Sequence, residues 1–517
     1  MSRRKTTDII AECVEQLLDH AVENISLPQE DVIYVRNLLL SRLKLEEPFD
    51  EPFKLDYDFQ DSIARIVAYA VNKKIIDPGE ELFFETEIFG MLTPPPSAIT
   101  EQFDNVAADK SIEEACSWLF SLSKANNYIR MPDIKKNVKW TAENQRGNIQ
   151  ITINTAKPEK DAKQVLLESK TPTANYPRCA LCPENVGFAG NLKRAARQTL
   201  RIIPVSLTDE PWYMQFSPYV YYDQHLIVFS QEHRPMELNL KSFERMAEFV
   251  YNTPHYFLGA NAPLPIVGGS ILSHDHYQGG SKVLPVFSAP ARKHYQFSTL
   301  PDVKVSVVNW YNSVIRLESR NITQAVSAAG ALLNVWSTYN APEVDIISSS
   351  IDPVDGREKQ HNTITPIARM NDRDICFDLI LRNNRTDSKH PFGIFHPAEE
   401  LHNIKKESIG LIEAMGLFIL PGRLESETRE IMKYLTGELR LDFAAIADEK
   451  NPLSKHLGMI MQLVNDYGST LKPGEASDAV KNYINDTCEK ILDTTAVFKN
   501  TPEGEAAFDD FMNLYTK

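Results

Sequence analysis

The first 130 or so residues carry apolar side chains three and four positions apart, which is the period of a helix with one buried face. The pattern is clear in Ile9–Ala21 and returns in Ile63–Val71, and Pro94-Pro95-Pro96 interrupts the chain after it. We expect an accessory helical region here, and it contains no candidate catalytic group.

The pattern changes near Gly147, where Ile149, Ile151 and Ile153 alternate with polar residues as in a half-buried strand. After Pro421-Gly422 the remainder is mostly charged amphipathic helix. Between these points the pattern predicts strands over 149–154, 212–216, 219–222, 226–230 and 375–382, and helices over 241–251, 305–316, 322–339 and 404–415.

Length and charge limit the class of protein. At about 150 residues per domain, 517 residues suggest roughly three units. A net charge of −15 disfavours a general nucleic-acid binder, because contact with a phosphate backbone needs an excess of Lys and Arg. It does not exclude a local basic pocket for one small anionic substrate.

Six cysteines are too few for a disulfide framework, and only Cys179 and Cys182 form a pair. Acidic residues interrupt the apolar positions near the N-terminus, so a signal peptide is not expected. No stretch approaches the roughly 18 apolar residues that cross a bilayer. We therefore expect a cytoplasmic protein without a membrane segment.

The most informative segment is Gly268–Gly280, which contains His274, His276 and Gln278. In a strand these three side chains would share one face, because successive residues point to opposite sides. A neutral imidazole can attack phosphorus and form a labile N–P bond, and an amide can donate to a phosphoryl oxygen. The sequence alone leaves two other readings open, a pair of metal ligands and two ordinary buried histidines.

Glycines flank this segment on both sides, which favours the chemical reading. Gly268, Gly269 and Ser270 offer backbone N–H groups and a hydroxyl to an anion.

The phrase Cys179-Ala180-Leu181-Cys182 supplies two thiolates, whereas a structural zinc needs four ligands. His233 and His274 are the best-placed histidines to complete such a set. Structural thiols and a redox pair are the alternatives. A redox C-x-x-C normally opens a helix, but Pro183 follows directly here.

Lysines form two local groups in this acidic chain: Lys157, Lys160 and Lys163, and the pair Lys405-Lys406. Such runs are usually solvated faces, but a substrate with several phosphates would require them.

These motifs together resemble the galactose-1-phosphate uridylyltransferases, specifically the second, bacterial type. The resemblance is carried by His274–Gln278, by the C-x-x-C about 95 positions upstream, by Gly268–Gly280 and by Ser217–Tyr222. In that family the motif is H-P-H-G-Q, and its second histidine becomes covalently uridylylated. The resemblance implies that His276 is the nucleophile, although Asp275 and Tyr277 replace the usual proline and glycine.

The resemblance also implies roles for other residues. Gln278 and Ser270 would hydrogen-bond the phosphoryl oxygens, and a structural zinc would be held by Cys179, Cys182, His233 and His274. The histidine cluster that holds iron in some members is not reproduced, since Phe395-His396-Pro397 keeps one candidate, so no iron and no redox cofactor are expected. Substrate contacts are implied for Asn261, Gly269, Lys157, Lys160, Lys406 and Glu413.

The implied fold is α+β, of the histidine-triad type, with two related antiparallel-sheet halves and helical additions at both ends. We divide the chain at 1–146, 147–298, 299–425 and 426–517. The implied reaction moves UMP from UDP-glucose to galactose 1-phosphate, in a cytoplasmic homodimer that binds neither nucleic acid nor membrane.

Three other functions are compatible with the residues. A nucleotide hydrolase or phosphorylase of the same superfamily would use the same histidine. A zinc-stabilised binding module would use both motifs only structurally, and a thiol redox protein would depend on Cys179 instead.

Overall fold

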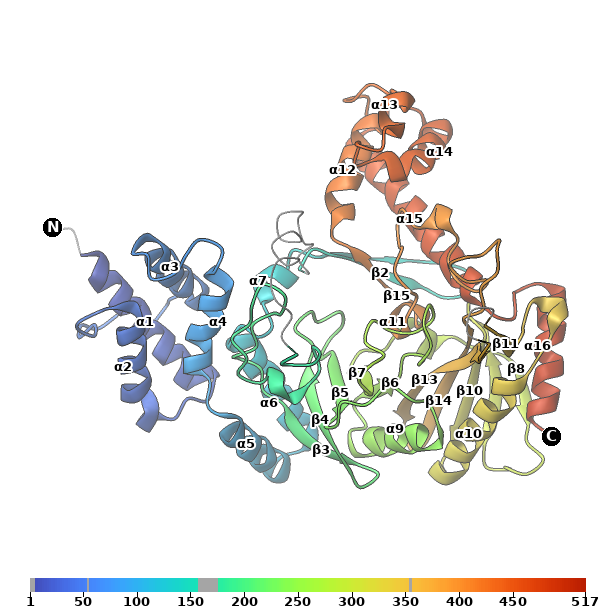
Figure 1. Ribbon diagram of the computed structural model, residues 1–517, viewed down its shortest axis with the longest axis horizontal. Helices are drawn as coiled ribbons and strands as arrows, with labels where there is room; N and C mark the ends of the chain where they lie inside the picture. The colour runs from blue at the N-terminus through green and yellow to red at the C-terminus, as the bar shows by residue number, and fades with distance from the viewer. Residues whose placement is uncertain (1–4, 54, 157–174, 353–355) are drawn as a thin grey trace.

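The computed structural model describes residues 5–53, 55–156, 175–352 and 356–517. A helical N-terminal part, a central sheet and a helical C-terminal part follow one another along the chain, and the two termini lie at opposite ends of the molecule (Figure 1). None of the described helices is both long enough and apolar enough to cross a membrane.

The N-terminal part is helical, as the periodicity predicts. The apolar stripe of the first helix, including Val14 and Leu17, is fully buried. Ser111 caps the sixth helix by accepting a hydrogen bond from the Glu114 N–H. The helices are α1 (Thr6–Asn24), α2 (Val32–Leu43), α3 (Phe59–Asn72), α4 (Glu81–Leu92), α5 (Pro96–Asp109), α6 (Ile112–Ala125) and α7 (Met131–Ile134).

A ten-stranded sheet, antiparallel at every pairing, forms the centre. Its order is β3-β4-β5-β7-β6-β13-β14-β10-β9-β8. The strands are β3 (Ile203–Leu207), β4 (Glu210–Phe216), β5 (Leu226–Ser230), β6 (Phe257–Gly259), β7 (His276–Gly280), β8 (Ala291–Gln296), β9 (Lys304–Val308), β10 (Val314–Ser319), β13 (Asn362–Asn371) and β14 (Asp374–Asn383).

This order contains the same five-strand arrangement twice. In each half three consecutive strands form a meander, a helix follows, and the next two strands return so that the fifth pairs with the third. The halves join through β6 and β13, where Leu258 pairs with Ala368. The predicted α+β fold with two related antiparallel halves is thus confirmed.

The helix of each half, α9 (Leu240–Asn252) and α10 (Ile322–Thr338), covers the same face of the sheet (Figure 1). Their apolar sides, with Phe243 on α9 and Ala325 on α10, join one hydrophobic core that continues into the N-terminal helices.

The opposite face of the sheet packs against a second core. Phe257 and Ile367 from the sheet meet Ile151 and Leu417 from a small three-stranded sheet. Helices that follow β15 extend this layer (Figure 1). The elements of the layer are β1 (Val138–Ala142), β2 (Ile149–Asn154), α11 (Leu411–Ala414), β15 (Leu417–Pro421), α12 (Arg423–Leu435), α13 (Phe443–Ala447), α14 (Leu457–Tyr467) and α15 (Pro473–Thr495). The last helix, α16 (Pro502–Tyr515), instead packs beside α10 in the first core.

Short elements complete the described chain. A separate hairpin consists of β11 (Ser349–Ile351) and β12 (Glu358–Gln360). The 3-10 helices are η1 (Gln29–Asp31), η2 (Pro183–Asn185), η3 (Pro285–Ser288), η4 (Pro342–Val344), η5 (Glu399–Leu401) and η6 (Ser454–His456).

Three predicted elements are wrong. The helix expected over 305–316 is the hairpin β9–β10, whose β-branched residues suit a buried strand. The helix expected over 404–415 is mostly irregular, and only Leu411–Ala414 forms a helical turn. The strand expected over 219–222 is a turn between β4 and β5, where Val220 has a positive φ of 40°.

A fully buried carboxylate, Asp378 on β14, sits on the sheet face that carries the second core. It pairs with Arg316 at 2.6 Å and Arg369 at 3.3 Å. Arg316 also donates to the carbonyls of Val286 and Ala289, so this cluster ties the second half of the sheet to η3.

We expect Asp378→Ala to lower the free energy of unfolding by about 3–5 kcal/mol, because it leaves buried guanidinium groups without their counter-charge. Asp374→Ala on the same strand removes only contacts with the exposed Arg320 and Lys304, and should cost less than about 1 kcal/mol. Equilibrium urea titrations compare the two, and equal losses would contradict a special role for the buried cluster.

Candidate active site and metal centre

His276 is the first residue of β7 and is buried, with 5% of its surface exposed. Its Nδ1 lies 2.7 Å from the carbonyl oxygen of His274. Because a carbonyl only accepts, the Nδ1–H must donate, and the lone pair of the ring is left on Nε2. The backbone therefore selects the tautomer whose Nε2 can act as a nucleophile.

Burial also sets the charge of this ring. It lowers the pKa of His276 to about 4, since the imidazolium form would lose its hydration. At neutral pH the ring is uncharged, as attack on phosphorus requires.

His274 does not lie on the same strand face as His276, and that expectation is wrong. It precedes β7 in a bend, and its ring turns toward a different neighbourhood. Its Nε2–H donates to the Ser230 carbonyl at 2.8 Å, which leaves the Nδ1 lone pair facing Cys179 at 3.2 Å and Cys182 at 3.7 Å.

The structure brings together the four residues of the predicted metal set. The ligand atoms of Cys179, Cys182, His233 and His274 all lie within 4.8 Å of one another. The two sulfurs are 3.5 Å apart, and His233 Nδ1 is 3.1 Å from Cys182 Sγ. Two thiols and two imidazoles at these separations fit a tetrahedral ion with bonds of about 2.0–2.3 Å. The cluster could therefore hold a metal such as zinc.

The pKa of one thiol in the cluster, that of Cys179, is shifted in the direction that favours metal binding. Burial opposes its ionisation, but the hydrogen bond with His274 and the Leu181 N–H together bring the pKa of Cys179 below its usual value. Metal binding requires the thiolate form.

Gln278 follows His276 by two residues on β7, so both side chains face the side of the sheet away from α9 and α10. The side-chain oxygen of Gln278 lies 3.1 Å from His225 Nε2. His225, which sequence reasoning missed, directly precedes β5. A histidine directly before an apolar strand, three residues after the phrase Ser217–Tyr222, was the signal that the sequence offered.

Asn261 and Gly269 meet in the loop before β7. A Cβ on Gly269 would lie 2.7 Å from the Asn261 amide nitrogen, so no side chain fits there. Asn261 also accepts a hydrogen bond from the Leu411 N–H at 2.9 Å, which connects this loop to α11 of the C-terminal half. Ser270, next in the chain, is exposed.

The predicted residue Glu413 lies on α11, close to Asn261, since both side chains adjoin the same residue, Gly410. Its ion-pair partner is Lys405, at 3.0 Å, whereas the predicted substrate-contact residue Lys406 is exposed. The predicted residues Lys157 and Lys160 lie outside the described residues.

Sequence reasoning also missed Arg382, at the end of β14. Its Nη2 donates to the Ile409 carbonyl at 2.7 Å. Burial lowers the pKa of Arg382 to about 10, and the nearby charge of Glu413 partly opposes this. An arginine directly after the apolar run Leu379–Leu381 was the available signal.

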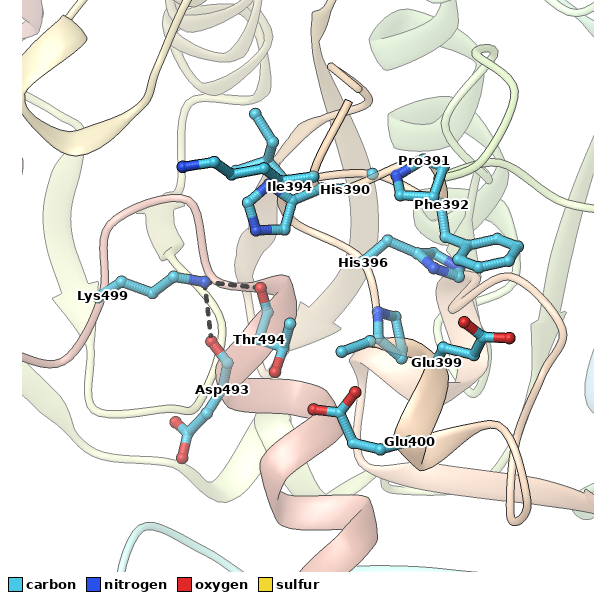
Figure 2. Close-up of a pocket in the computed structure, with 14 residues that line it drawn as sticks. His390, Pro391, Phe392, Ile394, His396, Glu399, Glu400, Asp493, Thr494 and Lys499 are labelled. Carbon is cyan, nitrogen blue, oxygen red and sulfur yellow. Dashed lines mark hydrogen bonds between the residues drawn. The ribbon is translucent and has the colours of Figure 1, made fainter. Parts of the chain in front are cut away.

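A cavity of about 620 Å³ lies elsewhere, against the end of α15 (Figure 2). Lys499 donates there to the carbonyls of Asp493 and Thr494, and His396 lies across the cavity. None of the predicted site residues that the structure describes lines it.

Comparison with known proteins agrees with this geometry. The family model of the galactose-1-phosphate uridyl transferase N-terminal domain matches residues 28–235, and that of the C-terminal domain matches residues 249–447. The chain belongs to the galactose-1-phosphate uridylyltransferase family. Its predicted assignment to the transferases is thus confirmed.

Curated members of the family match over nearly their whole length. The galactose-1-phosphate uridylyltransferase of Caldanaerobacter subterraneus is 43% identical, covering 96% of each chain. That of Fusobacterium nucleatum is 42% identical over 98% of each chain, and that of Bacillus subtilis is 39% identical over 98% of this chain and 97% of its own.

One solved structure, the yeast Ap4A phosphorylase Apa2, aligns with a TM-score of 0.31 and 9% identity, covering 64% of this chain and 90% of its own. That likeness is too weak to support a conclusion about fold or function.

We expect the purified protein to contain about one bound transition-metal ion per chain, and Cys182→Ala to lose most of it, because a structural site needs all four ligands. Cys376→Ala, which removes another buried thiol far along the chain on β14, is the matched control. Elemental analysis after gel filtration measures both. Metal retained by Cys182→Ala at the wild-type level would contradict the four-residue set.

Proposed function

We propose that this chain transfers UMP from UDP-glucose to galactose 1-phosphate through a covalent uridylyl group on His276. The observation that carries the proposal is the Nδ1–H hydrogen bond from His276 to the His274 carbonyl, which leaves a neutral Nε2 lone pair in a buried site. Family membership supplies the reaction class.

In the first half-reaction, His276 Nε2 attacks the α-phosphorus of UDP-glucose. An N–P bond forms and the P–O bond to glucose 1-phosphate breaks. Glucose 1-phosphate leaves with the electron pair of that bond. Charge develops on the phosphoryl oxygens, where Gln278 and the exposed hydroxyl of Ser270 are proposed to donate hydrogen bonds.

In the second half-reaction, a phosphate oxygen of galactose 1-phosphate attacks the same phosphorus. The N–P bond breaks, UDP-galactose forms, and His276 returns to its neutral state. Uridylyl transfer in both directions needs the ring in one tautomer throughout, and the His274 carbonyl holds it there.

We propose zinc as the ion of the four-residue cluster, in a structural role. With two thiolates and two imidazoles bound, zinc would be fully coordinated and would supply rigidity rather than an open site for substrate. A bound ion would hold His274 in place, and with it the His274 backbone carbonyl that orients His276.

Substrate contacts are proposed for Asn261, Gly269 and Glu413, which lie in one neighbourhood. The substrate contacts of Lys157, Lys160 and Lys406 stay predictions, as do the homodimer, the cytoplasmic location and the four-part division of the chain.

Mixing the protein with UDP-glucose should add one uridylyl group to the intact mass, with release of glucose 1-phosphate. His276→Gly should show no added mass, and galactose 1-phosphate should discharge the wild-type adduct as UDP-galactose. Intact-mass spectrometry measures this, with Cys376→Ala as a control that should label like the wild type. Discharge by water or inorganic phosphate instead would support a hydrolase or phosphorylase, and no adduct under any condition would contradict the proposal.

Substitution of the neighbouring residues Lys405 and Lys406 tests whether the ion pair with Glu413 contributes to the binding of galactose 1-phosphate. Lys405→Met should raise the KM for galactose 1-phosphate by about tenfold or more, because Glu413 loses the ion pair that positions it. Lys406→Met should change it less than about twofold, since the side chain is exposed. Steady-state kinetics decide between them, and a larger effect at Lys406 would favour the sequence-based prediction.

A further inference from the structure

We propose that His225 is a positioning residue for uridylyl transfer: its Nε2–H holds the side-chain oxygen of Gln278, so that the amide NH2 of Gln278 faces the transferred phosphoryl group. This inference rests on the proposed function, and His225 lies outside the motifs that carry the family resemblance.

The pairing of β5 with β7 places the two residues together. Ile227 pairs with Gln278, and His225, two positions earlier, points to the same face of the sheet. His225 therefore lies diagonally across from Gln278, on the face that also carries His276. The resulting contact joins His225 Nε2 to Gln278 Oε1 at 3.1 Å.

The surroundings of His225 determine which group donates in this hydrogen bond. His225 is 2% exposed, and within the described part of the chain its Nδ1 has no hydrogen-bond partner. Burial lowers the pKa of His225 to about 4, so its neutral ring carries one N–H. A proton on Nδ1 would bury a donor without an acceptor, whereas a proton on Nε2 finds the Gln278 oxygen.

Aromatic packing holds the His225 ring in place. Tyr222 lies against it with ring centroids 4.5 Å apart, and Tyr221 stacks at 5.3 Å. Tyr222 in turn packs on Gly280, where a Cβ would come within 2.6 Å of its ring. The ring of His225 is therefore enclosed and has little freedom to release Gln278.

The consequence concerns which end of the Gln278 amide meets the substrate. A free amide can present either its oxygen or its NH2, and the oxygen would repel a phosphoryl oxygen. With the oxygen engaged by His225, both N–H donors are left for the side of the strand where His276 would hold the phosphorus. His225 thus acts through Gln278 and not on the substrate.

The test compares His225→Phe, which keeps an aromatic ring but no donor, with His225→Gln, whose amide N–H can reach the same oxygen. Rapid-quench uridylylation by UDP-glucose should slow by about tenfold to a hundredfold in His225→Phe and recover in part in His225→Gln. Tyr222→Phe should match the wild type, because its hydroxyl has no hydrogen-bond partner among the described residues.

The double variant separates positioning from packing. If His225 acts through Gln278, then His225→Phe should add no further loss to Gln278→Leu. The inference would be overturned if the rate losses of the two single variants multiplied in the double variant, or if His225→Phe were as fast as the wild type. It would also be overturned if the rates of the His225 variants correlated with their melting temperatures and not with the presence of a hydrogen-bond donor.

A second measurement does not depend on activity. With 15N-labelled histidine, the NMR signals of His225 should show the neutral Nε2–H tautomer at pH 7, and Gln278→Leu should shift the Nε2 signal. A charged ring, the Nδ1–H tautomer or an unchanged signal would overturn the inference even if the protein were never uridylylated.

Discussion

The chemistry that we propose for this chain depends on one hydrogen bond, from the Nδ1–H of His276 to the carbonyl of His274. It determines which ring nitrogen carries the lone pair, and so which atom can attack phosphorus. The same residue that supplies the carbonyl has its ring in the Cys179, Cys182 and His233 cluster. The proposed nucleophile and the candidate metal centre are therefore linked through the backbone, with one residue, Asp275, between His274 and His276.

The repeated sheet explains how this arrangement is held. The first half supplies β7, which carries His276 and Gln278, and β5, which His225 directly precedes. The second half joins it through β6 and β13. Beyond that seam, α11 contributes Glu413, and the Leu411 N–H of α11 donates a hydrogen bond to the Asn261 side chain. The helices α9 and α10 cover the other face, so the site and the second core share one side of the sheet. The residues proposed to carry out the reaction therefore lie in one half of the sheet, and the other half completes their surroundings.

Much of this could be predicted from the sequence where local pattern and structure agree. Buried helices α1, α9 and α10 have clear periodicity, and β5 and β14 have apolar runs bounded by polar residues. The four metal-cluster residues came from a resemblance, and the structure gathers them.

The failures share a cause, which is that tertiary contact overrides spacing. Apolar residues over 305–316 fit a helical period, but pairing across β9 and β10 makes them a hairpin. Spacing placed His274 and His276 on one strand face, whereas the bend before β7 sends the His274 ring to the sulfurs. The sequence also could not show that Lys405 pairs with Glu413, because the pairing depends on the irregular path before α11. The substrate contact of Lys406 stays a prediction.

The central claim is that His276 accepts the uridylyl group on Nε2 because Nδ1 is committed to the His274 carbonyl. 31P NMR of the enzyme trapped with UDP-glucose, with 15N-labelled histidine, identifies the nitrogen bonded to phosphorus. We predict coupling to Nε2 of His276 alone. Coupling to Nδ1, or to any other histidine, would contradict the account.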